Sequence, residues 1–218
     1  MGGLVGIISN DAGRFSLFSS CVARLVERGL PPGSRLEWLI GGDWCGARNS
    51  LVEQALDEER DWLWFMDDDH AFSPSLLNRL LDHEVPLVMP FCLQRVYPFK
   101  PVAFTEPYGE VINPNEYEEE LVEIKEGGCA GMLIRSEVLR AIEPPYFEYA
   151  DRSEDVIFCE KAKAAGFPIY IDLGAQLGHI TTAVVWPTKQ DTDWKTGFTI
   201  GHELRLTTEW NAMEEVAA

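Results

Sequence analysis

Positive charge is scarce in this sequence of 218 residues. It has 18 Lys and Arg against 36 Asp and Glu, which gives a formal net charge of −18 at pH 7. Duplex DNA and anionic membrane surfaces are bound by clusters of Lys and Arg, so this composition disfavours both as partners. A local basic pocket for a small phosphate-bearing ligand remains compatible with it.

Cysteine motifs and long apolar runs are also lacking. The sequence contains no C-x-x-C, and its odd number of cysteines are scattered: Cys21, Cys45, Cys92, Cys129 and Cys159. This pattern argues against a disulfide framework or a zinc ribbon and favours reduced packing residues in a reducing compartment. No basic leader precedes the first apolar run, and no run approaches the ~18–20 residues of a membrane span. We therefore expect a cytoplasmic protein without a membrane segment.

Apolar runs and helical patterns alternate through the first 90 residues. Buried strands are predicted at 4–9, 36–40, 62–66 and 85–90, and helices at 14–29, 47–59 and from Ser73 onward. Strands separated by helices of this length indicate βαβ units and a mostly parallel sheet. The expected fold class is α/β, and the length favours a single domain over 1–218.

The second half of the sequence is less regular. Residues 91–126 contain several prolines and an acid-rich run at 116–123, and predict an excursion with short β pieces. The acid-rich run is typical of a solvated face. The alternative is a role in selecting an acceptor substrate. Strands are expected within 127–134 and 168–171, with short helices after Ser136 and Ser153. Residues 181–218 show no strong period and are interpreted as a C-terminal tail or lid.

One stretch, residues 62–72 (WLWFMDDDHAF), leads directly from a buried strand into three carboxylates. Ligands of open α/β sheets bind beyond the carboxyl ends of the strands. Side chains two positions apart in an extended segment share a side, so Asp67 and Asp69 face one ligand while Asp68 points elsewhere. Carboxylate oxygens suit Mg²⁺ or Mn²⁺ and the phosphate that such an ion carries. The alternative is a solvated turn at the strand end.

Three further positions are candidates for chemistry, each with a plain structural alternative. His179 is a candidate metal ligand or a packing histidine. Glu154 and Asp155 open a predicted helix, where acids either only complement the helix dipole or supply a general base. Arg48 at the start of another helix, and Arg95 beyond the fourth strand, are candidate anion-binding residues or exposed surface arginines.

These segments together resemble the nucleotide-sugar glycosyltransferases of the GT-A fold, close to the inverting glycosyltransferase family 2. The compact, acidic form is similar to phage-encoded members. The resemblance covers about residues 4–180 and is carried by motifs in a fixed order: Ala47-Arg48-Asn49, Phe65–Asp69 with Phe72 and Pro74, Gly127–Ile134, Ser153–Cys159 with Ala165–Phe167, and Asp172 with Gly178-His179.

The resemblance implies a GT-A (Rossmann-like) fold, with a mostly parallel central sheet flanked by helices and a small antiparallel β excursion. Residues 1–90 would form the nucleotide-binding half and 91–180 the acceptor and metal half. The implied reaction moves a sugar from a nucleotide-diphosphate donor to the hydroxyl of a glycan, protein or small molecule, with inversion. The implied cofactor is a divalent cation, Mn²⁺ or Mg²⁺.

The resemblance also implies roles for individual residues. Asp155, with Glu154 beside it, would be the catalytic base. Asp69 and His179 would bind the metal, with Asp67 contributing to the metal and the nucleoside. Residues implied in binding the nucleotide sugar are Asp67, Arg48, Asn49, Ser9, Gly128 and Arg95. The sequence departs from the family after Ser9, where Asn10 and Asp11 replace the usual small hydroxyl residues.

Several alternatives stay open from the sequence alone. The same fold serves retaining glycosyltransferases and nucleotidyltransferases, and a non-catalytic carbohydrate- or metal-binding derivative is a further reading. A phosphatase-like hydrolase is disfavoured, because Ala71 stands where its Asp-x-Asp-x-Thr/Val pattern needs another residue. The donor sugar, the nucleotide base, the acceptor and the oligomeric state are not specified by these residues.

Overall fold

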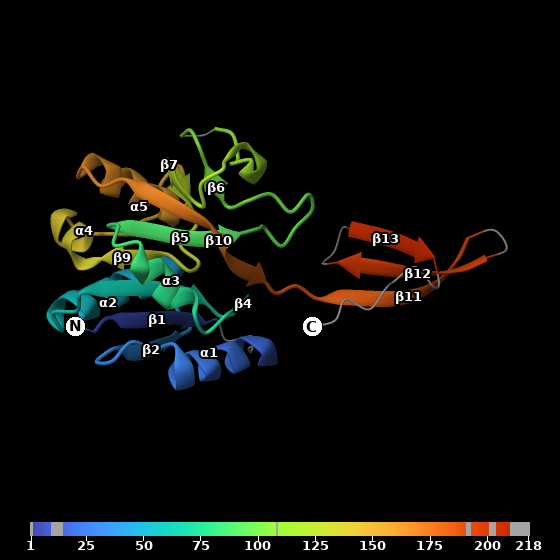
Figure 1. Ribbon diagram of the computed structural model, residues 1–218, viewed down its shortest axis with the longest axis horizontal. Helices are drawn as coiled ribbons and strands as arrows, with labels where there is room; N and C mark the ends of the chain where they lie inside the picture. The colour runs from blue at the N-terminus through green and yellow to red at the C-terminus, as the bar shows by residue number, and fades with distance from the viewer. Residues whose placement is uncertain (1, 10–14, 108, 191–192, 201–203, 210–218) are drawn as a thin grey trace.

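The computed structural model describes residues 2–9, 15–107, 109–190, 193–200 and 204–209. Its first half alternates strands and helices as predicted (Figure 1): β1 (Leu4–Ser9), α1 (Ser16–Arg28), β2 (Arg35–Ile40), α2 (Trp44–Asp57), β3 (Trp62–Asp67), β4 (His70–Phe72), α3 (Leu76–Asp82) and β5 (Leu87–Cys92). Helix α2 begins before the predicted Ala47, because the Asp43 carboxylate accepts a hydrogen bond from the Gly46 amide at 2.8 Å and caps the helix. Arg14, Asn10 and Asp11 lie outside the described residues.

The second half adds short strands and two helices: β6 (Ala103–Phe104), the 3₁₀ turn η1 (Pro114–Glu116), β7 (Leu121–Ile124), β8 (Glu126–Gly127), β9 (Leu133–Arg135), α4 (Ser136–Ala141), α5 (Glu154–Ala164) and β10 (Ile169–His179). The pair β6–β8 is the expected antiparallel excursion. The acid-rich run is only partly a solvated face, because its end forms β7 and pairs with β10. Strand β10 extends well past the predicted residue 171, since a bulge between Asp172 and Gln176 lets its pairing with β5 resume.

The central sheet has eight strands in the order β2-β1-β3-β9-β5-β10-β4, with β7 also paired to β10. From the pairings, β2, β1, β3, β5 and β10 run in one direction, and β9, β4 and β7 run in the other. The mostly parallel α/β sheet expected from the sequence is therefore confirmed. Its parallel strands bring their carboxyl ends to one edge, where ligands of open sheets bind.

Both faces of the sheet are covered, which explains why β3 is apolar without alternation. Leu63 and Phe65 point to a core shared with α2, α4 and α5. Trp64 and Met66 point to a second core shared with α1 and α3. The five cysteines are all buried and unpaired, as the reduced, packed state predicts. The rigid, doubly covered β3 fixes the position of the acids that follow it.

Residues beyond β10 form a separate antiparallel sheet of three strands: β11 (Ala183–Gln190), β12 (Asp193–Ile200) and β13 (Leu204–Glu209). Figure 1 shows this sheet extending away from the body. These strands have no strong hydrophobic period and were not predicted, although β-branched and aromatic residues such as Val184, Val185 and Trp186 favour them.

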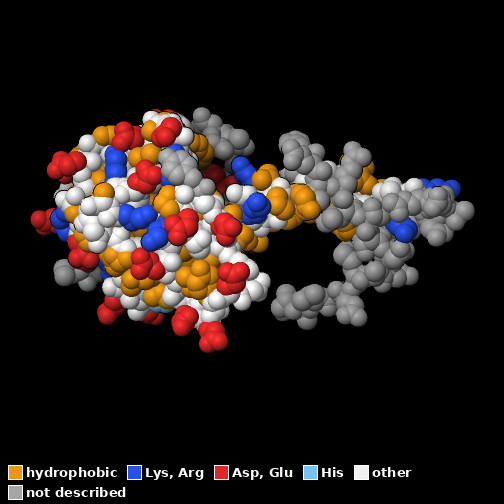
Figure 2. Space-filling model, turned by 90° about the horizontal axis from the view of Figure 1, so that it is seen from above, with side chains coloured by type: hydrophobic (Ala, Val, Ile, Leu, Met, Phe, Trp, Pro, Cys, Tyr) orange, Lys and Arg blue, Asp and Glu red, His pale blue; other side chains and the backbone are white. Residues whose placement is uncertain are grey.

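The distribution of charged side chains on the surface agrees with the acidic composition of the sequence. Figure 2 shows acidic side chains scattered over the visible face of the body. Within the described residues, no helix combines the length and apolar character that crossing a membrane would require.

Candidate functional site

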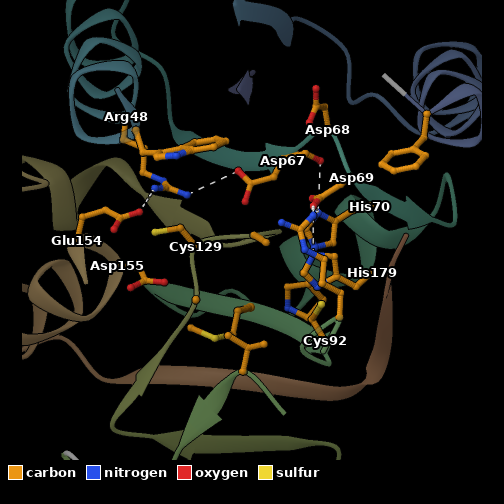
Figure 3. A pocket seen from close by; sticks show the side chains of 18 residues that line it. Arg48, Asp67, Asp68, Asp69, His70, Cys92, Cys129, Glu154, Asp155 and His179 are labelled. Atoms are coloured by element: carbon orange, nitrogen blue, oxygen red, sulfur yellow. Dashed lines mark hydrogen bonds and ion pairs between the residues drawn. The ribbon is translucent and has the colours of Figure 1, made fainter. Parts of the chain in front are cut away.

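A cavity of about 560 Å³ lies where β3, β5 and β10 end and where α2 and α5 begin. Its volume falls in the range of about 300–1,000 Å³ that is typical of small-molecule sites. Figure 3 shows two groups of labelled side chains facing each other across it. We call Asp69, His70, Cys92 and His179 the histidine corner, and Arg48, Glu154 and Asp155 the arginine corner. Asp67 lies between them.

A tight reversal of the chain builds the histidine corner. Asp67 ends β3, Asp68 and Asp69 form the turn, and His70 begins β4. Strand β4 pairs antiparallel with β10 so that His70 stands opposite His179. The two imidazoles stack with their ring centres 4.6 Å apart. Figure 3 shows Asp68 directed away from Asp67 and Asp69, although Asp68 also lines the cavity.

Asp69 is the anion at the centre of the histidine corner. Its Oδ1 lies 3.1 Å from Nδ1 of His70, and its Oδ2 lies 3.2 Å from Nε2 of His179. Arg95 Nη1 donates to the same Oδ2 at 2.5 Å. Burial alone would raise the pKa of Asp69, but the two histidines outweigh it and hold that pKa well below its usual range. Asp69 is therefore ionised, and cationic groups surround it.

His70, Cys92 and His179 gather so closely that one ligand atom of each lies within 4.8 Å of the other two. Burial alone would lower the pKa of both histidines, but the Asp69 carboxylate and the Cys92 thiol raise it to about 9 for His70 and about 10 for His179. Burial would raise the pKa of Cys92, yet the two histidines bring it below its usual value. The surroundings of this corner favour positive charge.

Arg48 organises the arginine corner. Its side chain is only 4% exposed, so the alternative of an exposed surface arginine was wrong. One guanidinium nitrogen pairs with Glu154, and another lies 3.6 Å from Asp67 Oδ1. Burial would lower the pKa of Arg48, but the neighbouring acids Asp67, Glu154 and Asp155 help to raise it above its ordinary value. Arg48 thus joins the end of β3 to the first turn of α5.

Asp155 stands beside Glu154 in the first turn of α5 and lines the cavity. Its Oδ1 accepts hydrogen bonds from the Ser153 hydroxyl and, at 2.8 Å, from the Val156 amide. A Cβ built on Gly128 would lie 3.5 Å from Asp155 Oδ2 and 2.8 Å from a methyl group of Val102. The glycine therefore keeps the space in front of this carboxylate open.

Two residues implied by the resemblance do not line the cavity. The Ser9 hydroxyl is buried and accepts a hydrogen bond from Trp38 Nε1 at 2.6 Å. The Asn49 side chain donates to the Phe147 carbonyl at 2.7 Å and accepts from the Tyr146 amide at 2.9 Å. These bonds give Ser9 and Asn49 structural roles. The other residues implied for the site do line the cavity: Arg48, Asp67, Asp69, Arg95, Gly128, Glu154, Asp155 and His179.

Two members of the histidine corner were missed by sequence reasoning. His70 follows the three acids directly, but only the reversal into β4 and its register with β10 bring it opposite His179. Cys92 was interpreted as a packing residue, and it is buried as expected. A cysteine at the end of a parallel strand, at the sheet edge that carries the acids, was the signal available in the sequence.

Comparisons with solved structures bear on the fold alone. The chain is similar over 83% of its length to GalNAc-T7 solved with UDP, GalNAc and Mn²⁺, with 12% identity and a TM-score of 0.55, and it spans 44% of that chain. It is also similar over 99% of its length, and over 98% of the other chain, to the viral protein A197 from STIV, with 14% identity and a TM-score of 0.54. No family model and no curated protein matches the sequence.

The fold is GT-A-like. At identities of 12% and 14% the likeness carries the architecture and not the activity. The activity of this chain therefore depends on the side chains in its own cavity.

Proposed function

We propose that the protein is a metal-dependent glycosyltransferase that moves a sugar from a nucleotide-diphosphate donor to an acceptor hydroxyl with inversion. One observation carries the proposal: in a GT-A-like fold, a single cavity holds a corner of metal-ligand side chains around Asp69 and His179 and, facing it, the Asp155 carboxylate. That arrangement provides a seat for the leaving group and a base for the acceptor at one site.

The residues present fit a divalent cation. His70 is 2% exposed, and its Nε2 has no hydrogen-bond partner within the described part of the chain. This orphaned nitrogen belongs to the group of three donors with Cys92 and His179. A cation bound there, beside Asp69, would supply neutralisation of the charge that develops on the departing diphosphate.

The arginines suit the donor. Arg48 is held at the cavity wall by Glu154 and Asp67, and Arg95 reaches the cavity edge with its side chain about half exposed. Arginine forks bind phosphate oxygens with charge-assisted hydrogen bonds. In the proposal, Arg95 exchanges its contact with Asp69 for a phosphate of the donor, and Asp67 accepts a hydrogen bond from the nucleoside.

Asp155 is proposed as the base in preference to Glu154. Glu154 is committed to Arg48, whereas Asp155 Oδ2 faces the space kept open by Gly128. Asp155 takes the proton of the acceptor hydroxyl, and the acceptor oxygen forms a bond to the anomeric carbon. The bond from that carbon to the diphosphate oxygen breaks on the opposite face, which inverts the centre and releases the nucleoside diphosphate. A positioned base contributes typically ~10²–10⁴-fold to the rate.

Calorimetry with Mn²⁺ and, separately, Zn²⁺ present, and with UDP-, GDP- and dTDP-sugars in turn, tests the proposal. We expect one nucleotide class to bind and its binding to require the cation. Mass analysis of acceptors incubated with that donor should show the added mass of the sugar, and NMR should show an inverted anomeric linkage. Absence of metal-dependent binding by every donor would sink the proposal.

Other outcomes would redirect it. A product carrying the nucleotide indicates a nucleotidyltransferase, and a retained anomeric configuration indicates a retaining enzyme. Donor binding with no turnover of any acceptor indicates a non-catalytic binding module, in which Asp155→Asn has no activity to remove. Glycan, peptide and small-molecule acceptors belong in the same panel, because the cavity residues do not distinguish among them.

A further inference from the structure

The histidine corner contains a donor set that differs from an oxygen-rich magnesium site. Two imidazoles and one thiol, from His70, His179 and Cys92, bring their ligand atoms within 4.8 Å of one another. With zinc bond lengths of 2.0–2.3 Å, donors in a tetrahedral site lie roughly 3.3–3.8 Å apart. Side-chain rotations that move these atoms by about an ångström would therefore place all three on one ion.

Both imidazoles are held in the orientation that metal binding needs. His179 Nδ1 lies 3.0 Å from the Leu93 carbonyl oxygen and donates to it, while its Nε2 lies 3.2 Å from Asp69 Oδ2. A metal ion would take the place of the proton that Nε2 directs at Asp69. His70 Nδ1 lies 3.1 Å from Asp69 Oδ1 and 3.4 Å from the Asp67 carbonyl. Such contacts to carboxylates and carbonyls fix the ring and leave the other nitrogen for a metal.

The unpartnered ring nitrogen of His70 is a second, independent observation that indicates a bound metal ion. Its ring is almost fully buried, and its Nε2 lacks a hydrogen-bond partner among the described residues. A buried polar atom without a partner destabilises the fold. A metal ion would satisfy this nitrogen, and the stacked His179 and the buried Cys92 offer the remaining donors on the same side.

We propose that His70, Cys92 and His179 together bind one borderline-soft divalent ion, of the class of Zn²⁺, Co²⁺ or Fe²⁺, in preference to Mg²⁺ and Mn²⁺. Asp69 is then the positioning residue that orients His70, and not the principal ligand that the resemblance implies. The inference deepens the proposed function, and rests on it only in placing this ion next to the donor diphosphate.

The preference follows from the donor atoms. Thiolate and imidazole favour zinc and its neighbours, whereas magnesium and manganese favour carboxylate and water oxygens. Three protein ligands leave a further coordination position, as in zinc sites that work on a substrate. On binding, Cys92 would release its proton and coordinate as thiolate, and His70 and His179 would each release the proton of the nitrogen that takes the metal. A donor phosphate oxygen would reach the remaining position from the cavity that these three residues line.

Titration of the full chain with Co²⁺ alone, without nucleotide, tests the coordination directly. We expect an intense thiolate-to-cobalt charge-transfer band in the near ultraviolet and visible bands of tetrahedral strength. In competition calorimetry, Zn²⁺ should displace Co²⁺, while Mg²⁺ and Mn²⁺ at the same concentration should not. A cobalt complex without the thiolate band, or displacement by Mg²⁺ as effective as by Zn²⁺, would overturn the proposal.

Cys92→Ser should abolish the band and weaken zinc binding by more than the about 10–100-fold that altering an outer-shell partner of a ligand costs. Cys45→Ser is the matched control, because Cys45 and Cys92 are both 7% exposed and Cys45 lies outside the donor group. It should keep the band. Cys92→Asp, which restores a negative oxygen donor, should bind Mn²⁺ more tightly than the unmodified chain does. Failure of this shift would count against Cys92 as a ligand even if Cys92→Ser did not fold.

Asp69→Asn separates a positioning role from a ligand role. It should lower zinc affinity about 10–100-fold while the thiolate band persists, because Cys92 still binds. Loss of the band together with affinity would show that Asp69 is essential to assembling the set and would refute the division of roles. These measurements use no nucleotide sugar. The metal site can therefore be established if glycosyl transfer is not found, and glycosyl transfer can be established if this metal site is not found.

Discussion

Two clusters in this molecule combine an aspartate with histidine and arginine: one surrounds Asp172, and the other is the histidine corner around Asp69. They differ in whether their polar side-chain atoms all have hydrogen-bond partners. Asp172, on β10, is fully buried. Its carboxylate accepts from Arg79 at 2.7 and 2.8 Å and contacts His83 Nε2 at 2.7 Å. The amides of Gly174 and Ala175 donate to it at 2.9 and 3.1 Å. Both oxygens of this carboxylate have hydrogen-bond partners within the protein, so we call this the closed cluster.

The histidine corner uses the same residue types with a different result. Asp69 contacts His70, His179 and Arg95, yet the imidazole Nε2 of His70 has no hydrogen-bond partner among the described residues and Cys92 stands beside it. This cluster opens into the cavity, whereas Asp172 does not line it. The comparison teaches that residue type alone does not mark a site. Unsatisfied donors at a cavity wall separate a binding cluster from a structural one.

The largest expected effect concerns the open cavity. Replacing Asp155 by Asn removes the proposed base and should lower sugar transfer about 10²–10⁴-fold, measured as initial rate with the donor identified by calorimetry. The unfolding free energy should change little, because Oδ1 keeps its acceptor role. Glu137→Gln, an exposed acid in the first turn of α4, is the matched control and should transfer at the normal rate. Equal rates for both variants would remove Asp155 from the mechanism.

The next effect concerns the closed cluster. Asp172→Ala should cost about 3 kcal/mol of unfolding free energy, because Arg79 and His83 lose their anion and the Gly174 and Ala175 amides lose their acceptor. Urea unfolding followed by tryptophan fluorescence measures this loss. Asp69→Asn should cost less than this, because the Asp69 and Arg95 side chains are partly exposed and solvent screens the charges left behind. A larger loss of unfolding free energy in Asp69→Asn than in Asp172→Ala would show that the histidine corner, and not the Asp172 cluster, is the more important for stability.

A smaller effect is the pH dependence of the closed cluster. Burial would raise the pKa of Asp172, but Arg79 and His83 lower it below the unfolded value of about 3.9. A carboxylate with a lowered folded pKa contributes stability that is fully present above the unfolded pKa and is lost as pH falls through the folded pKa. We expect the unfolding free energy to fall below about pH 4, and to fall less steeply in Asp172→Asn. Identical slopes between pH 5 and 3 would contradict this.

The smallest effect lies at an exposed ion pair. Arg28 and Glu27 approach to 3.0 Å at the end of α1, where both side chains are exposed. Solvent screens such pairs, so Glu27→Gln should change the unfolding free energy by less than about 0.5 kcal/mol. Thermal unfolding checks it. A change above about 1 kcal/mol would mean that proximity of charges, and not burial, governs the stability of this protein.

Much of the fold was predictable because its signals are local. Apolar runs without alternation marked β1, β3 and β5, and the helix patterns between them indicated the parallel sheet. The β11–β13 sheet was missed because its strands lack a strict hydrophobic period. The length of β10 was missed because continuation past Asp172 depends on a bulge that only the pairing with β5 reveals.

The site was predictable where a side chain follows directly from a strand or helix end. Asp67, Asp69 and Asp155 were found this way, and they line the cavity. His70 and Cys92 were missed because their proximity arises from strand register, which is non-local. Ser9 and Asn49 were selected through the family resemblance, which does not record that Trp38 and the 146–147 backbone already engage them.

The register that sets His70 opposite His179 also has a consequence for folding. The contact from Asp69 to His179 spans 110 residues of sequence, and β4 contributes only three residues to the sheet. Contacts of such separation form late, because loop closure must precede them. The first half of the chain can therefore emerge with its three acids in place and still lack the histidine corner. Metal uptake in a refolding experiment would report completion of β10, and would follow the burial of the β3 tryptophans.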